Sequence, residues 1–310
     1  MARRKKGKAV HGWLILDNPP GMTSTQAVGI VRRLLDAQKA GHAGTLDPLA
    51  TGVLPIALGE ATKTVPYAVD GEKAYQFTVR WGAETDTDDA EGRTTATSEL
   101  RPDRAAIEAL LPRFIGNILQ QPPSFSAIKV DGARAYDLAR AGEEIDLAAR
   151  PVQIFTFRLV TLPDRDTAVF EAECGKGTYV RALARDMGRA LGCHGHVIAL
   201  RRTRVGSFLE NGAVTMEALE AAAEEAETAV EDLLLPVEAA LSGLLAFDVA
   251  RKDAARLLQG QPVIIRGRDA PAEVDACYTM CGGRLVALGR IEKGQLVPVR
   301  VFNFSDSRGH

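Results

Sequence analysis

Residues 41–59, GHAGTLDPLATGVLPIALG, constrain the fold of this chain more than any other segment. They contain four glycines, two prolines and a central Asp47, and they interrupt the helical period that comes before them. Such a density of glycine and proline excludes a continuing helix, and the apolar run near residues 53–58 is typical of a buried strand. The chain must therefore place a loop that carries an aspartate directly before a core strand.

The remaining pattern alternates strands with helices. GWLILD predicts a short buried strand, and Thr23 and Gln26 are spaced as a capping box for a helix that we expect to reach about Gln38. AYQFTVRW, residues 74–81, alternates like a strand. The other predicted elements are helices over residues 102–111, 135–140, 178–191, 216–232 and 253–258, a hairpin around 129–133, and strands over 152–160, 168–174, 285–291 and 296–302.

Length and composition narrow the class of protein. The 310 residues suit one catalytic core with a smaller appended domain. With 46% hydrophobic and 25% charged residues, the chain is unlike disordered, collagen-like or coiled-coil proteins. Four cysteines are too few for a disulfide framework, and the apolar stretch after MARRKKGKAV is too short for a signal peptide or a membrane span. We expect a cytoplasmic protein without a membrane segment.

The net charge of −2 conceals a segregation of charge. Residues 175–206 carry seven Lys or Arg against one acid, whereas residues 217–232 carry seven acids and no base. Arg181, Arg185 and Arg189 follow one another at four-residue spacing on one face of the helix predicted over 178–191. A segregated basic patch is typical of a polyanion partner, but on charge alone a solvated helix face explains it equally well.

Other kinds of chemistry have weak support. The acidic loop GAETDTDDAEG lacks a ligand and the glycine of an EF-hand, so we expect a solvated turn between strands. The CHGH run at residues 193–196 lacks the spacing of a zinc site, and GKGT at 175–178 lacks the Walker spacing. Neither a dinucleotide fingerprint nor a G-x-S-x-G elbow is present.

Four segments, in order, resemble the TruB family of tRNA pseudouridine-55 synthases. They are LDNPPGMTS, the GTLDP stretch preceded by His, QQPPSFSAIKVDGARAYDLAR, and GKGTYVRALARDMG with ALRRTRVGSF. The resemblance covers roughly residues 10–210, and four motifs in order are far more specific than any one of them. Alone, an aspartate before a proline is usually a turn-former. The chain departs from the family at Asn18, where a Lys is usual, which leaves open whether that position is structural or holds phosphate.

The resemblance implies an α/β (α+β) fold. A flexible basic arm would cover residues 1–9, and a catalytic domain with a mixed, largely antiparallel sheet flanked by helices would cover 10–240. A small β-rich, PUA-like barrel domain would cover 246–310, where it would extend the RNA contact or serve only stability. The activity implied is isomerisation of uridine-55 to pseudouridine in the T-loop (TΨC arm) of tRNA. The base is flipped out, its N-glycosidic bond is cleaved, and it is reattached through C5.

The resemblance also implies roles for single residues. Asp47 would act at C1′ as glycosidase carboxylates do, and Arg181 would keep it ionised. Tyr75 would stack on the uracil and serve as proton-abstracting base, with core packing as the alternative. His42 would fill the space that the flipped base leaves. Tyr179 and Leu200 would line the pocket, although core packing explains Leu200 almost as well.

The expected partner is the T-arm of tRNA. The side chains assigned to its phosphate backbone are Lys176, Arg185, Arg201 and Arg202. The resemblance implies neither a cofactor nor a metal, no obligate protein partner, and a monomer. Two alternatives stay open: a guide-dependent or rRNA-directed relative, and an RNA-binding module whose chemistry is incidental.

Overall fold

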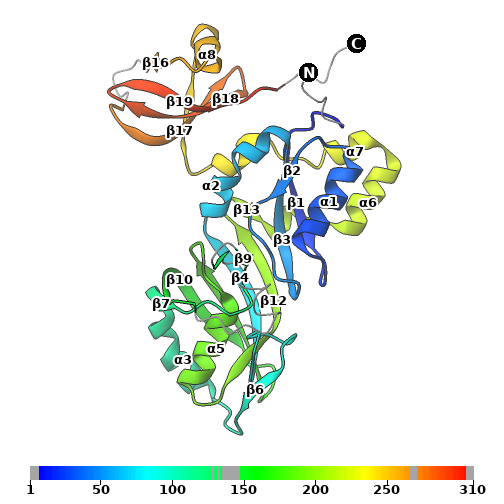
Figure 1. The fold of residues 1–310 in the computed structure, drawn as a ribbon, viewed down its shortest axis with the longest axis vertical. Helices are drawn as coiled ribbons and strands as arrows, with labels where there is room; N and C mark the ends of the chain where they lie inside the picture. Colours follow the sequence, from blue (N-terminus) through cyan, green and yellow to red (C-terminus); the bar gives the residue numbers. More distant parts are fainter. Residues whose placement is uncertain (1–6, 127–128, 131–132, 135–146, 266–270, 305–310) are drawn as a thin grey trace.

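The computed structural model describes residues 7–126, 129–130, 133–134, 147–265 and 271–304, and its largest element is a ten-stranded sheet (Figure 1). The main strand order is β14-β1-β3-β12-β4-β11-β10-β7, with β2 beside β3 and β13 beside β12. The strands are β1 (Gly12–Asn18), β2 (Ala40–His42), β3 (Ala50–Leu58), β4 (Lys73–Trp81), β7 (Gly116–Gln120), β10 (Arg150–Thr161), β11 (Thr167–Cys174), β12 (Gly195–Val205), β13 (Phe208–Leu209) and β14 (Val214–Thr215). The β1–β14 and β3–β12 pairs are parallel and the others antiparallel, which confirms the mixed, largely antiparallel sheet.

Helices and a second domain cover the two faces of this sheet. The helices that pack on this sheet are α1 (Ser24–Leu34), α2 (Val65–Asp70), α3 (Arg104–Leu110), α5 (Val180–Ala190), α6 (Met216–Glu225) and α7 (Glu227–Glu231). Apolar side chains of α1, α3, α5 and α6 join the core on one face. On the other face α2 packs with short 3-10 turns at Gly59–Lys63 and Val237–Leu241. Because β1 is buried on both faces, its run of apolar residues has no polar alternation.

Alternation in β4 places a row of aromatic side chains in the core. Phe77 and Trp81 point inward, and Phe77 stacks on Phe157 and Phe170 at ring-centroid distances of 5.9 and 5.6 Å. Stacked aromatic rings add to the stabilisation that burial alone provides. The central strands β4 and β12 therefore form a rigid base for the loops at their ends.

Most of the predicted elements are present, with differences at helix ends. The capping box at Thr23 and Gln26 is confirmed, but α1 ends at Leu34 rather than near residue 38. It ends early because Asp36 takes a left-handed conformation (φ 42°), and Lys8 of the expected arm pairs there with Asp36 and Gln38. The acidic helix predicted over 216–232 is broken by the extended backbone of Ala226.

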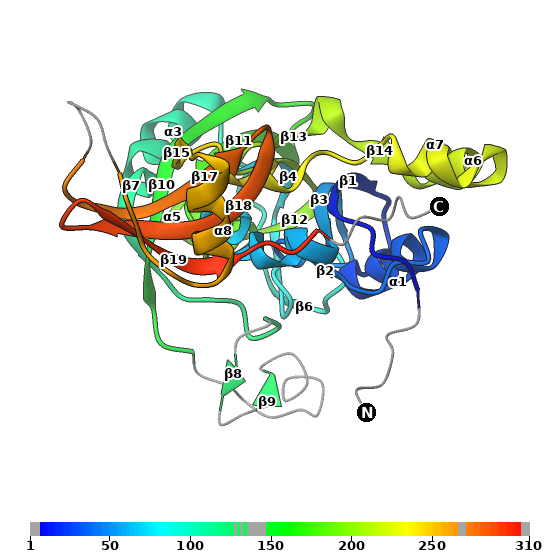
Figure 2. The ribbon, with the colours of Figure 1, turned by 90° about the horizontal axis from the view of Figure 1, so that it is seen from above.

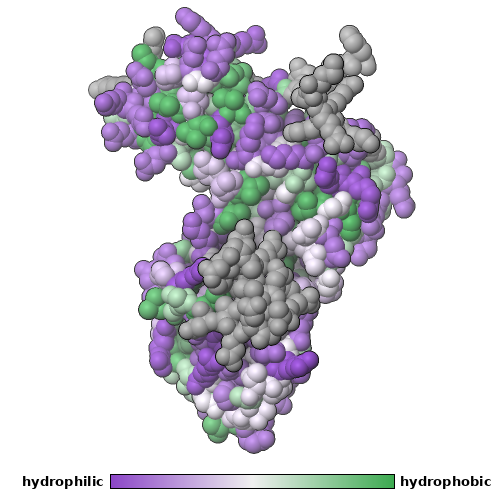
Figure 3. All heavy atoms as spheres, in the orientation of Figure 1, coloured by the Kyte–Doolittle hydropathy of each residue, from purple (hydrophilic) through white to green (hydrophobic). Residues whose placement is uncertain are grey.

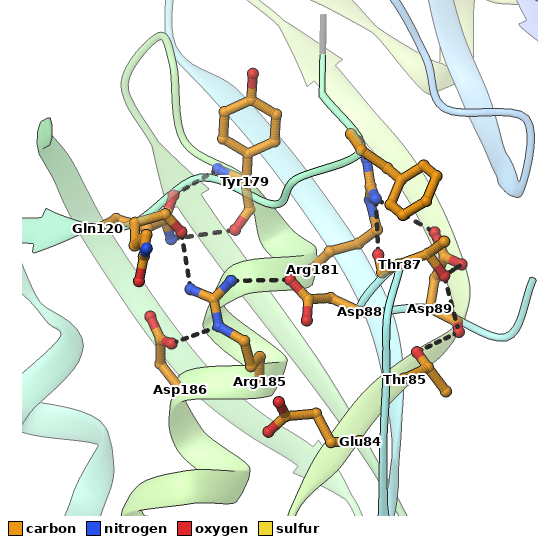
Figure 4. Close-up of polar contacts among 12 residues, drawn as sticks. Glu84, Thr85, Thr87, Asp88, Asp89, Gln120, Tyr179, Arg181, Arg185 and Asp186 are labelled. Atoms are coloured by element: carbon orange, nitrogen blue, oxygen red, sulfur yellow. Dashed lines mark hydrogen bonds and ion pairs between the residues drawn. The ribbon is translucent and has the colours of Figure 1, made fainter. Parts of the chain in front are cut away.

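Two smaller pairs of strands project from the sheet. β5 (Ala83–Thr85) pairs with β6 (Thr94–Thr97), and the predicted hairpin is confirmed as β8 (Lys129–Val130) with β9 (Ala133–Arg134) (Figure 2). The helix predicted over 135–140 lies outside the described residues. The segment Gln120–Ser126, which leads to β8, passes directly over the start of α5 (Figure 4).

The C-terminal domain is a five-stranded sheet in the order β15-β17-β18-β19-β16, which confirms the small β-rich domain. Its elements are β15 (Leu245–Asp248), α8 (Arg251–Leu258), β16 (Val263–Ile264), β17 (Val274–Cys281), β18 (Arg284–Glu292) and β19 (Gln295–Val301). Leu285, Leu288 and Phe302 pack in one cluster with Trp13 of β1, so the two domains share an apolar contact (Figure 1).

On the face drawn in Figure 3, polar and apolar residues are interspersed rather than gathered into one continuous apolar patch. Within the described residues, no helix is both long and apolar enough to cross a membrane.

Candidate active site

Residues 43–49, here called the Asp47 loop, connect β2 to β3. Two hydrogen bonds tie the loop to the first residue of α1 and to the turn before it: Leu46 N–H donates to Ser24 Oγ (2.9 Å) and Gly21 N–H donates to Pro48 O (3.0 Å). The Asp47 side chain keeps 36% of its surface exposed. The turn therefore holds the loop, while the carboxylate remains open to solvent.

Asn18 belongs to the same turn. It is fully buried, and its amide donates to Met22 O (2.9 Å) and Pro19 O (3.2 Å). A buried amide with two backbone acceptors stabilises a turn and does not reach an external phosphate. In this chain the position is structural, which answers the question that the sequence left open.

Arg181 of α5 is the partner of Asp47. Its Nε donates to Asp47 Oδ2 (2.8 Å), and its two terminal nitrogens donate to Thr87 O (2.8 Å) and Phe125 O (2.9 Å). The Arg181 side chain is 5% exposed, and Asp89 Oδ2 lies 3.5 Å from its Nη1. Burial acts to lower the pKa of Arg181, but Asp47 and Asp89 raise it above its ordinary value. A permanently charged guanidinium thus lies behind a half-exposed carboxylate.

The next arginine of α5 repeats this arrangement one turn further on (Figure 4). Arg185 donates to Asp88 Oδ2 (2.9 Å), to Asp186 Oδ1 (2.8 Å) and to Gln121 O (2.8 Å). Burial raises the pKa of Asp88 to about 6, against the opposing effect of Arg185. Arg189, a further turn along, binds both oxygens of Glu84. The arginine row therefore faces an acidic strip, with Arg181 and Arg185 buried and Arg189 half exposed at the end of the helix.

Two sequence predictions are wrong as a result. The acidic loop is not a solvated turn, because Asp88 and Asp89 are buried against α5. Arg185 is 6% exposed and binds carboxylates, so it does not lie on a phosphate-facing surface. Asp88 and Asp89 were missed as site residues. The available signal was charge complementarity between the acids at residues 84–89 and three arginines spaced at four residues.

Arg202 of β12 is also internal, at 2% exposed, so its assignment to the RNA backbone is corrected in the same way. It donates to Val53 O (2.8 Å), Gly44 O (3.1 Å) and Thr45 O (3.3 Å). These carbonyls lie on either side of Asp47 along the chain. Tyr75 of β4 is its direct cross-strand neighbour.

Tyr75 and His42 are both near this arginine. Burial raises the pKa of Tyr75 to about 12, although the charge of Arg202 acts in the opposite direction. Tyr75 is therefore a neutral phenol at pH 7. Burial lowers the pKa of His42, and Arg202 lowers it further, so its imidazole is neutral.

Tyr179 and Leu200 lie on elements that border the Asp47 loop. Tyr179 precedes α5, and its backbone exchanges two hydrogen bonds with the Gln120 side chain, at 2.8 and 3.1 Å. Leu200 is 7% exposed in β12, where it pairs with Ala50 at the end of the loop. Because the Leu200 side chain is buried, core packing remains an alternative to a role in lining the pocket.

Two of the four assigned backbone contacts remain near the surface. The Lys176 side chain is 68% exposed, in the loop before α5, and binds Asp70 at 2.8 Å. The Arg201 side chain is 36% exposed and binds Asp17 and Glu210 at 2.9 Å. An RNA phosphate would have to compete with these carboxylates, at low cost in the case of exposed pairs.

The assembled site contains one open carboxylate, a buried cation behind it, a phenol and a neutral imidazole. Such a carboxylate can attack an electrophilic carbon or stabilise positive charge that develops on a sugar. In the described part of the chain, no group of three or more His, Cys, Asp and Glu side chains is arranged to hold a metal ion.

The sequence matches two family models. The TruB family pseudouridylate synthase N-terminal domain matches residues 32–180, and the tRNA pseudouridylate synthase B C-terminal domain matches residues 181–242. The tRNA pseudouridine synthase B of Bradyrhizobium diazoefficiens is 61% identical, over 97% of this chain and 88% of the relative. That of Caulobacter vibrioides is 55% identical, over 98% of this chain and 100% of the relative.

Solved structures have the same fold. A chain of a Cbf5–Nop10–Gar1 complex superposes with a TM-score of 0.72 at 25% identity, covering 95% of this chain and 85% of that one. A chain of an H/ACA RNP bound to a substrate RNA containing 2′-deoxyuridine gives 0.73 at 22% identity, covering 99% and 92%. Fold, site and relatives together define a pseudouridine synthase, which is an isomerase. Within that class the chain belongs to the TruB family.

Proposed function

We propose that this enzyme converts uridine-55 in the T-loop of tRNA to pseudouridine. The observation that carries the proposal is the Asp47–Arg181 pair, an open carboxylate bonded at 2.8 Å to a buried guanidinium. The names of the relatives support tRNA as the substrate class. We also propose that the protein acts in the cytoplasm, as a monomer and without a cofactor, metal or obligate protein partner.

The target base must leave its stack before Asp47 can reach C1′. In the proposed reaction, the carboxylate attacks C1′ or supports the cation that forms there while the N1–C1′ bond breaks. The uracil turns, C5 bonds to C1′, the hydrogen of C5 leaves as a proton, and N1 gains one. Substrate and product are isomers, so the balance needs no oxidant or reductant.

The neighbouring side chains have distinct parts in this proposal. Neutral His42 occupies the space of the flipped base, and Tyr179 and Leu200 border the uracil. Tyr75, protonated in the free enzyme, stacks on the base, and it removes the C5 proton only if the intermediate lowers the pKa of the phenol. Lys176 and Arg201 contact phosphates, and the C-terminal domain extends the contact with tRNA.

Release of tritium from an unmodified tRNA transcript that carries [5-³H]uridine tests the proposal, because formation of the C5 bond must expel that hydrogen. Wild-type protein should release label, whereas Asp47→Asn protein should bind the transcript and release none. A transcript with cytidine at position 55 is the matched control for position.

The outcomes separate the alternatives. Release from the U55 transcript alone supports the proposal, and release only when a guide RNA is added favours a guide-dependent enzyme. Binding without release favours an RNA-binding module. Equal release from the cytidine-55 transcript would show that another uridine is modified.

A further inference from the structure

Arg202 is a charged side chain enclosed in the core, directly beside the Asp47 loop. It is one of the largest fully buried side chains of the protein, at 2% exposed. Across the described residues, no carboxylate oxygen lies within 4.0 Å of its guanidinium. Burial of a charge is costly unless its hydrogen bonds are satisfied, so a position of this kind needs a compensating role.

The hydrogen bonds of Arg202 all lead toward the site. Its Nε donates to Val53 O at 2.8 Å, and its terminal nitrogens donate to Gly44 O at 3.1 Å and Thr45 O at 3.3 Å. The first carbonyl follows Asp47 in the chain and the other two precede it. One planar guanidinium therefore joins the part of the Asp47 loop before Asp47 to β3, the strand that follows the loop, which a lysine ammonium cannot do in the same geometry.

Two glycines allow this close approach. A Cβ on Gly52 would lie 2.3 Å from Arg202 O, and a Cβ on Gly44 would lie 3.4 Å from Arg202 Nη1. Both glycines have positive φ, at +96° and +99°. The start of β3 thus fits the backbone of Arg202, and the Asp47 loop fits its side chain.

The same guanidinium reaches the second reactive side chain of the site. In the sheet, Arg202 lies between Gly52 of β3 and Tyr75 of β4, directly opposite each of them. Cross-strand neighbours share a face of the sheet, so the Arg202 side chain lies on the same face as Tyr75, and its charge acts on the phenol. The Asp47 loop and Tyr75 therefore share one buried cationic neighbour.

We propose that Arg202 is a positioning residue, which holds the Asp47 loop in a fixed place beside Tyr75 from the buried side of the site. It touches neither substrate nor phosphate. This inference rests on the proposed function, because its first readout is the conversion of uridine in tRNA.

The first test compares Arg202→Lys with wild type and with Arg158→Lys as a matched control. Arg158 lies in β10 of the same sheet, is 64% exposed and pairs with Glu171. Because a shift of about 1 Å at a reacting group costs about 100-fold in rate, we expect Arg202→Lys to lower single-turnover tritium release by about that factor. Its tRNA Kd should stay within about 3-fold of wild type, with the same salt dependence, since no phosphate contact is lost. Arg158→Lys should match wild type in both.

Three results would overturn the proposal. A rise in Kd with a salt slope smaller by about 1 would mean that Arg202 contacts phosphate after all. Parallel falls in melting temperature, binding and turnover would indicate a purely structural role. Unchanged turnover would mean that a lysine at this position serves equally well. If wild-type protein releases no tritium at all, the proposed function fails. The comparison of turnover between wild type and Arg202→Lys then carries no information about Arg202.

A second measurement needs neither activity nor an Arg202 variant that folds. The Nε–H of Arg202 is buried against Val53 O, so its resonance in a ¹⁵N spectrum should exchange slowly with water. Tyr75→Phe retains the ring and removes only the hydroxyl. We expect one slowly exchanging arginine Nε–H resonance to shift in that variant. An unchanged set of these resonances would refute the link between Arg202 and Tyr75.

Discussion

Asp88 should make the stability of the protein depend on pH in an unusual direction. Burial raises its pKa from 3.8 to about 6. In the unfolded chain the same carboxyl group loses its proton near pH 3.8. Between pH 3.8 and about pH 6, therefore, only the folded state keeps the proton, and the free energy of unfolding falls as the pH rises. At about 1.4 kcal/mol per pH unit, the whole contribution is about 3 kcal/mol, present below pH 4 and lost by pH 7. About 1.4 kcal/mol of it disappears between pH 5 and pH 8.

Asp88→Asn isolates this effect, because an amide has nearly the shape of the protonated carboxyl and does not titrate. Urea unfolding of both proteins at pH 5 and pH 8 gives the measurement. The variant should gain about 1.4 kcal/mol relative to wild type over that interval. Asp186→Asn, which removes the other carboxylate from Arg185, controls for the loss of an ion pair. A difference that is constant with pH, or that moves the other way, would show that pairing with Arg185 outweighs burial.

Three further predictions concern turnover and binding of tRNA. Asp47→Asn should abolish tritium release while Kd changes by no more than about 3-fold, because the carboxylate acts in the reaction and contributes little to affinity. Arg181→Lys should lower turnover by about 10²- to 10³-fold with a modest change in Kd, since the charge stays but the bonds to Thr87 O and Phe125 O are lost; equal losses in filter binding and turnover would contradict this. Lys176→Ala should weaken binding similarly for different tRNAs and reduce the slope of log Kd against log salt by about 1, whereas an unchanged slope would exclude a phosphate contact there.

The elements that could be predicted are those with local causes. β4 alternates because one face packs in the core, and α1 begins where Thr23 and Gln26 exchange hydrogen bonds. The break at Ala226 has no comparable signal, because the residues around it favour helix. The pairing of Asp47 with Arg181 followed from family resemblance, since no spacing rule relates residues 134 positions apart.

The spacing of the arginines in α5 could not predict whether they point toward solvent or into the protein. A row at four-residue spacing fixes one face of a helix but does not say whether that face meets water or protein. The rest of α5 contained the missing information. Val180, Leu183, Ala184 and Met187 are buried as well, so most of the helix apart from its last turn has little surface left for solvent.

A helix with such a composition has to be internal, and its charges then need partners of opposite sign. The acids at residues 84–89 are the nearest such run, and they lie against α5. Arg202 is a different case, because its partners are carbonyl oxygens, which every residue carries and no sequence pattern distinguishes. A buried arginine that binds backbone can be recognised only once the fold brings the two strands and the loop together.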